Sequence, residues 1–205
     1  MSTQLVWDMD GTLLDSTAVV PDAFIGAVQE LHGPTVDREA VVAAYPLGVP
    51  EVILAHLLGR PLAAGEADAY YRRLRGVLPP PYPGVAAVLA ELRARGHLVV
   101  VFTGASTRAA ATLLTGAGLE IDLLVGGDQI ARPKPAPDGL LLAARRLELP
   151  PAALAYIGDA PTDLRAARAA GSSSVAAGWG HLYDPAEPAH RTLTAPGEAL
   201  ALIHA

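Results

Sequence analysis

The chain has 205 residues, 51% of them hydrophobic and 18% charged, with 20 glycines and 18 prolines. This composition supports a sizeable core and excludes collagen, coiled coil and intrinsic disorder, and the length predicts one main domain plus an insert. The formal net charge of −6 argues against a general nucleic-acid or membrane partner, because anionic phosphate groups bind to a basic face.

Cysteine is absent, which excludes disulfides, thiolate metal sites and cysteine nucleophiles and favours a cytoplasmic location. Asp8 comes too early in the chain for an apolar signal segment. No uncharged apolar stretch reaches the ~18 residues of a transmembrane helix. We therefore expect a soluble, cytoplasmic protein, and the sequence does not indicate its oligomeric state.

Short apolar runs alternate along the chain with stretches rich in alanine, leucine and arginine. The runs predict five strands, at 5–8, 98–103, 122–126, 154–158 and 174–177. The intervening stretches predict helices at 85–95, 106–115, 139–147 and 161–170. Strands that alternate with helices are typical of a parallel sheet covered by helices. The expected fold class is therefore α/β, with a Rossmann-like parallel sheet.

A long helical segment separates the first two strands, and a direct crossover does not need so much chain. Its helices are expected around Phe24–Leu31, at 50–58 and at 65–78, with Gly33-Pro34 ending the first. The proline-rich stretch 79–83 then leads back. We predict an α/β core domain of residues 1–16 and 80–205 and a small helical cap domain of residues 17–79.

Polar side chains follow the predicted strands at their carboxyl ends, where open parallel sheets bind ligands. Asp8, Asp10 and Thr12 follow the first strand, Thr103 and Gly104 the second, Lys134 the third, and Asp159 and Asp163 the fourth. Aspartate and glycine are common turn formers, so each of these residues taken singly has an ordinary structural explanation. Together they predict a site at one edge of the sheet.

The gathered carboxylates require a cation. Two carboxylates 4 Å apart repel by about 4 kcal/mol at an effective dielectric constant near 20. Lys134 is the only lysine beside 14 arginines, and its ammonium group can approach phosphate oxygens and a carboxylate together. The sequence therefore predicts a cation at this cluster and a functional role for Lys134.

These residues resemble the four motifs of the haloacid dehalogenase superfamily: the string at 8–13, Thr103, Lys134-Pro135, and Gly158-Asp159 with Asp163. The strings at 10–16, 132–137, 158–163 and 178–180 look most like its phosphoglycolate phosphatase and β-phosphoglucomutase branch. That branch carries a helical cap at the place of the insert. One departure is Gly104, where many relatives have asparagine.

The resemblance implies an Mg²⁺-dependent phosphatase that acts on a small phosphate monoester, such as phosphoglycolate or a sugar phosphate, through an aspartyl-phosphate. Asp8 would be the nucleophile and Asp10 the general acid and base, with its pKa raised by neighbouring carboxylates. Mg²⁺ would be held by Asp8, the Asp10 carbonyl and Asp159, with Asp163 nearby. Thr12, Thr103, Gly104 and Lys134 would bind the phosphate and the substrate.

Two other functions are compatible with the same residues. A β-phosphoglucomutase-like phosphomutase would use the same core and differ in its cap contacts. A receiver-like signalling protein also combines an aspartate cluster, a threonine and a Lys-Pro pair on a parallel sheet.

In the cap, we interpret Tyr70 and Tyr71 as packing residues and the arginines at 72, 73 and 75 as a solvated helix face. His181 is interpreted as an isolated histidine, of a kind that is commonly structural or exposed.

Overall fold

The computed structural model describes residues 3–203 of the chain. Within them a six-stranded sheet has the order β3-β2-β1-β4-β5-β6, and each neighbouring pair is parallel. The strands are β1 (Gln4–Trp7), β2 (Val100–Phe102), β3 (Leu123–Val125), β4 (Leu154–Gly158), β5 (Ser173–Ala177) and β6 (Arg191–Leu193). The predicted α/β class is confirmed.

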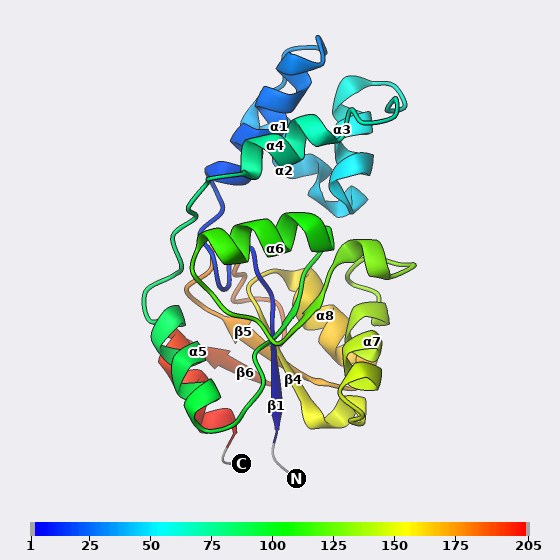
Figure 1. The fold of residues 1–205 in the computed structure, drawn as a ribbon. Helices are drawn as coiled ribbons and strands as arrows, with labels where there is room; N and C mark the ends of the chain where they lie inside the picture. Colours follow the sequence, from blue (N-terminus) through cyan, green and yellow to red (C-terminus); the bar gives the residue numbers. More distant parts are fainter. Residues whose placement is uncertain (1–2, 204–205) are drawn as a thin grey trace.

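Helices cover both faces of this sheet (Figure 1). They are α5 (Val85–Ala94), α6 (Thr107–Gly116), α7 (Asp138–Arg146) and α8 (Pro161–Ala170), with short 3₁₀ helices η2 (Gly127–Gln129), η3 (Pro151–Ala153) and η4 (Pro196–Leu202). Successive strand residues point to opposite faces. Trp7 and Ile157 therefore join one buried cluster with α5 and α6, whereas Val6 and Tyr156 join another with α7 and α8.

The remaining helices form the cap, which lies beyond the carboxyl ends of the strands (Figure 1). They are α1 (Val19–Glu30), α2 (Arg38–Ala44), η1 (Tyr45–Leu47), α3 (Pro50–Leu58) and α4 (Asp68–Leu74). Helices α1 and α4 are joined by the stacked rings of Phe24 and Tyr70, whose centroids are 4.2 Å apart. The domain boundaries at 17 and 79 stay a prediction.

The structure corrects several predicted elements. Strand β6 was missed, because it is a three-residue edge strand that carries no run of apolar residues. Helix α2 was missed as well, although Asp37 caps it by accepting a hydrogen bond from the Ala40 amide at 2.8 Å. The helix predicted at 65–78 is shorter, since the backbone is extended at Arg75 and Gly76 has a φ of +76°.

Two antiparallel segments connect the cap to the core. The Asp15 amide donates to the Pro80 carbonyl at 2.9 Å, and the Tyr82 amide donates to the Leu13 carbonyl at 3.0 Å. A β-bridge joins Leu14 and Pro81 between these two bonds. The entry and exit of the cap are thus held side by side, so movement of the cap relative to the core would have to occur at one narrow connection.

The cap also contacts the core directly at α6. The Tyr71 hydroxyl lies 2.8 Å from the Ser106 hydroxyl, and Arg108 pairs with Asp68 at 2.7 Å. The Arg108 guanidinium also lies over the Tyr71 ring, 4.0 Å from its centroid. Tyr71 packs in the cap as interpreted, with its ring 5.4 Å from that of Tyr70, and its hydroxyl group also joins the cap to the core.

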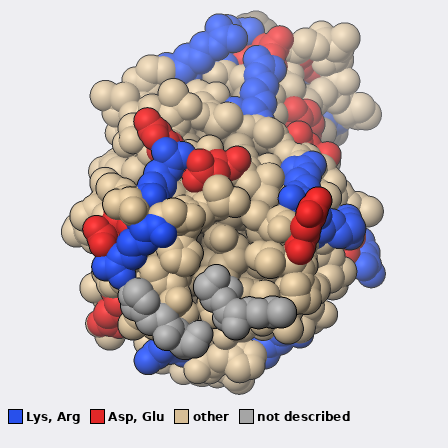
Figure 2. Space-filling model, turned by 60° about the horizontal axis from the view of Figure 1, so that its bottom comes forward, with Lys and Arg blue, Asp and Glu red and all other residues tan. Residues whose placement is uncertain are grey.

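The opposite end of the molecule, which bears the chain termini, carries charges of both signs. Figure 2 shows Lys or Arg and Asp or Glu side chains interspersed over a mostly uncharged surface at this end. This face therefore carries no extended basic patch. Among the described residues, no helix has the length and apolar character needed to span a membrane.

Packing at the start of α7 generates a stability prediction. A Cβ atom on Gly139 would lie 2.1 Å from the ring of the buried Phe102. We expect Gly139→Ala to lower the free energy of unfolding by about 1–3 kcal/mol, the usual cost of overpacking a core. Urea unfolding measures this change. Gly197→Ala is the matched control, because a Cβ there meets no atom within 4 Å, and an equal loss in both variants would contradict the packing explanation.

Candidate active site

The site begins in the turn that follows β1. The Asp8 amide donates to the Ile157 carbonyl of β4 at 2.8 Å, which aligns the end of β1 with its neighbour. Gly11 has a φ of +80°, and a Cβ there would lie 2.3 Å from an Asp159 carboxylate oxygen. Only glycine satisfies both the backbone conformation and this close approach. The turn can therefore press directly against the loop after β4.

Lys134 connects two of the predicted carboxylates. Its Nζ atom lies 2.8 Å from Asp8 Oδ1 and 2.6 Å from Asp163 Oδ1, and it donates to the Tyr156 hydroxyl at 3.2 Å. Burial disfavours the charged amine, but the two carboxylates outweigh burial and hold the pKa of Lys134 above its usual value. The lysine is therefore a fixed ammonium ion beside Asp8.

Three carboxylates gather around this ammonium group. One oxygen atom from each of Asp8, Asp159 and Asp163 lies within 4.8 Å of the others, and the residues are only 4%, 1% and 0% exposed. Burial, followed by the charge of Asp163, raises the pKa of Asp8 well above its usual value. Burial likewise raises the pKa of Asp159 to about 6. Burial is the main cause of both shifts, and the charge of Asp163 adds to each, a repulsion that a cation would relieve.

The charges and donor atoms of this cluster fit a divalent metal ion. When ionised, the three carboxylates and the Lys134 ammonium group leave two uncompensated negative charges. Carboxylate oxygens are the ligands that Mg²⁺ and similar hard cations prefer. The buried aspartate cluster is therefore a candidate site for a divalent cation.

Both oxygens of Asp163 are already engaged. Oδ1 binds Lys134, and Oδ2 accepts a hydrogen bond from the Ala160 amide at 3.0 Å. Asp159 is held differently, since its Oδ2 accepts from the Leu182 amide at 2.8 Å and its Oδ1 from the Thr12 hydroxyl at 3.5 Å. Asp163 is thus arranged to position the lysine, whereas Asp159 depends on neighbours from two other loops.

Asp10 lies apart from the carboxylate cluster. Its Oδ1 accepts a hydrogen bond from the Ser16 hydroxyl at 2.6 Å. The pKa of Asp10 is raised, chiefly by burial, while Ser16 and Lys134 oppose the shift. The predicted cause of this shift was neighbouring carboxylates, but Asp163 contributes less than burial does. A carboxyl group with a raised pKa is suited to donate a proton.

Thr103 and Gly104 follow β2 at the same edge of the sheet. The Thr103 hydroxyl is buried and accepts a hydrogen bond from the Ala105 amide at 3.1 Å. A Cβ on Gly104 would lie 3.9 Å from Lys134 Cε, which is an ordinary contact. The structure therefore places all the predicted site residues in the loops at the carboxyl edge of the sheet.

Several residues of this region were missed by sequence reasoning. Tyr156 donates to the Phe102 carbonyl at 2.8 Å and carries its hydroxyl between Lys134 and the carboxylates. Its position inside a buried strand looks like ordinary core, so the sequence holds no signal for it. His181 was interpreted as isolated, but its Nδ1 lies 3.9 Å from Asp159 Oδ2.

The sequence did indicate one further residue of this region, Trp179, which lies in the Gly-Trp-Gly string at 178–180. Its indole nitrogen donates to the Thr12 carbonyl at 2.9 Å. A Cβ on the adjacent Gly180 would lie 2.2 Å from the Asp159 Cβ. The Gly-Trp-Gly string at 178–180 thus supports the site. Gly180 lets its backbone approach Asp159 closely, and Trp179 holds the turn after β1.

Comparison with known proteins identifies the family. A sequence model of the haloacid dehalogenase-like hydrolases matches residues 4–171. The chain belongs to this family. It is 35% identical over 192 residues to a probable phosphatase IndB of Dickeya dadantii, covering 88% of this chain and 83% of that protein. It is 34% identical over 179 residues to a phosphoglycolate phosphatase of Cupriavidus necator, covering 82% and 78% respectively.

Solved structures agree with this placement among the haloacid dehalogenase-like hydrolases. The crystal structure of CbbY from Rhodobacter sphaeroides in complex with phosphate superimposes with a TM-score of 0.83 at 26% identity, covering 100% of both chains. The predicted family and the predicted enzyme class, a phosphatase, are therefore confirmed. Small phosphate esters are the substrate class that this family membership implies.

The carboxylate cluster predicts a measurable response to metal ions. We expect Mg²⁺ to raise the melting temperature of the protein, because a ligand at 100 times its Kd stabilises the folded state by about 2.7 kcal/mol. In Asp159→Asn this response should be lost. Without metal, Asp159→Asn should melt no lower than the parent protein at pH 7.5. At this pH, above the Asp159 pKa of about 6, the side chain is an ionised carboxylate that burial disfavours, and the neutral asparagine removes this cost.

Differential scanning fluorimetry with and without Mg²⁺ measures both changes. Asp184→Asn is the matched control, because Asp184 is exposed and accepts a hydrogen bond from the nearby Ala186 amide. An undiminished metal response in Asp159→Asn would show that the cation binds elsewhere.

Proposed function

We propose that this protein is an Mg²⁺-dependent phosphatase that hydrolyses a small phosphate monoester through an aspartyl-phosphate on Asp8. The observation that carries the proposal is the Lys134 ammonium group, which bridges Asp8 and Asp163 inside the buried carboxylate cluster. This arrangement presents a carboxylate nucleophile beside a fixed positive charge. A phosphoryl group could approach Asp8 without facing unbalanced negative charge.

The proposed reaction has two steps. In the first, an Asp8 carboxylate oxygen attacks phosphorus, the bond to the ester oxygen breaks, and Asp10 gives its proton to the departing alcohol. In the second, Asp10 removes a proton from water, which attacks phosphorus and releases Asp8 and inorganic phosphate. The raised pKa of Asp10 and its hydrogen bond from Ser16 support this role, because the first step needs a protonated and oriented carboxyl group.

Metal and phosphate contacts follow from the same geometry. Mg²⁺ would be held by Asp8, the Asp10 carbonyl and Asp159, with Asp163 nearby. When bound, the ion would supply positive charge that neutralises the phosphoryl oxygens. Thr12, Thr103, Lys134 and the backbone at Gly104 would hold the phosphoryl oxygens. Asp163 supports this arrangement by fixing Lys134.

The names of relatives favour hydrolysis of small phosphate monoesters. Besides the phosphoglycolate phosphatase, a relative from Pseudomonas aeruginosa that is 33% identical over 205 residues is named N-acetylmuramic acid 6-phosphate phosphatase. The alternative is a phosphomutase, which would interconvert sugar phosphates without releasing free phosphate. A receiver-like function is set aside because the family match extends over residues 4–171. The expected cytoplasmic location stays a prediction.

Substitution of the two reacting carboxylates tests the mechanism. We expect Asp8→Asn to abolish turnover, because the amide cannot form the aspartyl-phosphate. Asp10→Asn should slow turnover by about 10²–10⁴-fold through loss of the proton donor. Release of inorganic phosphate from an activated aryl phosphate with Mg²⁺ measures both rates. Asp184→Asn should retain the parent rate, and substantial turnover by a folded Asp8→Asn protein would refute the assignment of the nucleophile.

Gly104 provides a second test at the phosphate-binding end. A side chain fits there, since the nearest atom to a Cβ at this position would lie 3.9 Å away. We expect Gly104→Asn to fold normally and to lower KM by about 3–10-fold, the effect of one added hydrogen bond. Gly104→Ala should leave KM near the parent value. Equal changes of KM in both variants would argue that backbone stiffening, not the amide, is responsible.

A further inference from the structure

Tyr71 of α4 is held by packing at the place where the cap meets the core, since α4 lies next to α6 (Figure 1). The residue is only 4% exposed, and its ring lies edge-on to that of Tyr70, with the centroids 5.4 Å apart. The Arg108 guanidinium of α6 covers the same ring, 4.0 Å from its centroid. The position of the Tyr71 hydroxyl is therefore fixed by the surroundings of its ring.

The Tyr71 hydroxyl has two partners, and one arrangement of protons satisfies both. It donates to Glu51 Oε1 at 2.6 Å and lies 2.8 Å from Ser106 Oγ. A phenol has one proton and an ionised carboxylate only accepts, so the Ser106 hydroxyl must donate to Tyr71. Ser106 Oγ accepts in turn from the Ala109 amide at 3.3 Å. A directed chain of hydrogen bonds thus runs from the first turn of α6 to a carboxylate of the cap.

Ser106 belongs to the loop that is proposed to bind phosphate. It directly follows the segment 103–105, in which the Thr103 hydroxyl accepts a hydrogen bond from the Ala105 amide at 3.1 Å. The Ala105 carbonyl accepts from the Gly127 amide at 2.7 Å, which ties this segment to the loop after β3. Because the segment is short and bound along its length, its position is coupled to that of Ser106. The cap therefore binds the loop that carries Thr103.

A second part of the cap lies against the same loops. Val49, just before α3, has its Cγ1 atom 3.4 Å from the position of a Cβ on Gly127. That Cβ position would lie 2.3 Å from the Gly104 carbonyl oxygen, so glycine allows the loops after β2 and β3 to touch. The chain connection between cap and core lies on the other side of the cap from α3 (Figure 1). The cap thus contacts the proposed phosphate-binding loop away from its own connection.

The other polar contact between α4 and α6 is weaker. Arg108 and Asp68 lie 2.7 Å apart, but their side chains are 49% and 46% exposed. Exposed ion pairs contribute little to stability, because water and salt screen them. Tyr71 and Ser106 are both buried. The bond between their hydroxyls is therefore the contact that best explains how the cap is held in this closed arrangement, with α4 against α6.

We propose that the Tyr71 hydroxyl is a positioning group of the phosphatase: through Ser106 it holds the cap closed against the loop after β2 and keeps that loop in the arrangement that binds phosphate. Without this bond the cap would be free to move about its connection to the core. Only the closed fraction would then bind the phosphoryl group at full affinity. This inference rests on the proposed function, which assigns the loop to phosphate, and adds to it a residue of the cap.

The position of the cap tests the bond independently of activity. Cysteine is absent from the chain, so His56→Cys on α3 and Ala111→Cys on α6 place one spin label on the cap and one on the core, both at exposed positions. We expect Tyr71→Phe to add a population at longer distance, measured by double electron–electron resonance. Tyr183→Phe, which removes a hydroxyl outside the cap, is the matched control and should not. A distance distribution unchanged by Tyr71→Phe would overturn the inference.

Inhibition by inorganic phosphate measures the effect on the phosphate-binding loop. We expect Tyr71→Phe to raise the Ki of phosphate, and the KM of an activated aryl phosphate, by about 3–10-fold, the effect of losing one hydrogen bond. The value of kcat should stay near that of the parent, because saturating substrate itself favours the closed cap. Asp68→Asn should leave Ki near the parent value, since its ion pair is exposed. A fall in kcat with unchanged KM and Ki would contradict a positioning role.

A double-mutant cycle assigns the effect to the bond between Tyr71 and Ser106. Ser106→Ala should raise the Ki of phosphate about as much as Tyr71→Phe does, and the two changes together should have little further effect. Ser106 also caps α6, so Ser106→Thr, which keeps both the capping oxygen and the donated proton, should restore the parent Ki. Fully additive effects would show that the Tyr71 hydroxyl acts independently of Ser106, contrary to the inference.

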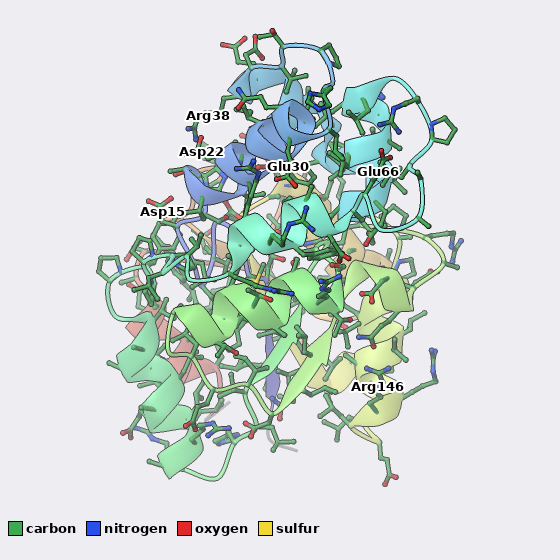
Figure 3. All side chains as sticks on the ribbon, turned by 45° about the horizontal axis from the view of Figure 1, so that its top comes forward. Asp15, Asp22, Glu30, Arg38, Glu66 and Arg146 are labelled. Atoms are coloured by element: carbon green, nitrogen blue, oxygen red, sulfur yellow. The ribbon has the colours of Figure 1, made fainter. Side chains whose placement is uncertain are left out.

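Glu51 allows the chain of hydrogen bonds to be weakened without being broken. Glu51→Gln keeps an acceptor for Tyr71 but removes the charge that strengthens the bond, so it should raise the Ki of phosphate less than Tyr71→Phe does. Glu66→Gln is the matched control, because Glu66 pairs with Arg60 in the segment before α4 (Figure 3). Equal increases of Ki in the two variants would indicate a general effect of cap charge and would count against this chain.

Failure of the proposed function would look different from failure of this inference. If the parent protein releases no phosphate from the aryl phosphate in the presence of Mg²⁺, the phosphatase mechanism is wrong, whatever distances the spin labels give. If the parent is active and Tyr71→Phe opens the cap but leaves Ki and KM unchanged, the hydroxyl holds the cap without positioning the loop, and the inference is overturned.

Discussion

The ammonium group of Lys134 between Asp8 and Asp163 is the interaction on which the rest of the site depends. Several kcal/mol of repulsion would arise among three buried carboxylates without an opposing charge. Lysine offsets one charge and leaves two, so the core is built to remain incomplete without a divalent cation. In the proposed mechanism, stability at this edge of the sheet would be given up for the ability to bind metal and phosphate together.

Close approach of backbone segments makes this concentration of charge possible. Gly11, Gly158 and Gly180 each lie where a Cβ would collide with Asp159 or Asp163. The loops after β1, β4 and β5 therefore converge more tightly than side chains would allow. Hydrogen bonds from the Leu182 and Ala160 amides then hold the carboxylates in place. Glycines and backbone donors thus do the positioning, and the aspartates supply the chemistry.

How far the sequence could predict this molecule depends on where each residue lies. Asp8, Lys134 and Asp159 each follow the end of a predicted strand. Because the carboxyl ends of parallel strands lie at one edge of the sheet, the sequence predicts that these side chains come together. Tyr156 was not, because a tyrosine inside a buried strand is indistinguishable from core until its hydroxyl is seen beside Lys134. The edge strand β6 and the seven-residue helix α2 are too short to show a recognisable hydrophobic pattern in the sequence.

In the proposed mechanism, the cap and the core would contact different parts of the substrate. The core supplies one fixed cation and a place for a second, which suits the phosphoryl group that every phosphate ester shares. The cap meets the core through Tyr71, Ser106 and Arg108, where Arg108 also pairs with Asp68 of the cap. Because the core would neutralise the phosphate, a charge on the rest of the substrate would have to be balanced by the cap. Discrimination among leaving groups would then rest on the side chains that the cap places over this edge of the sheet.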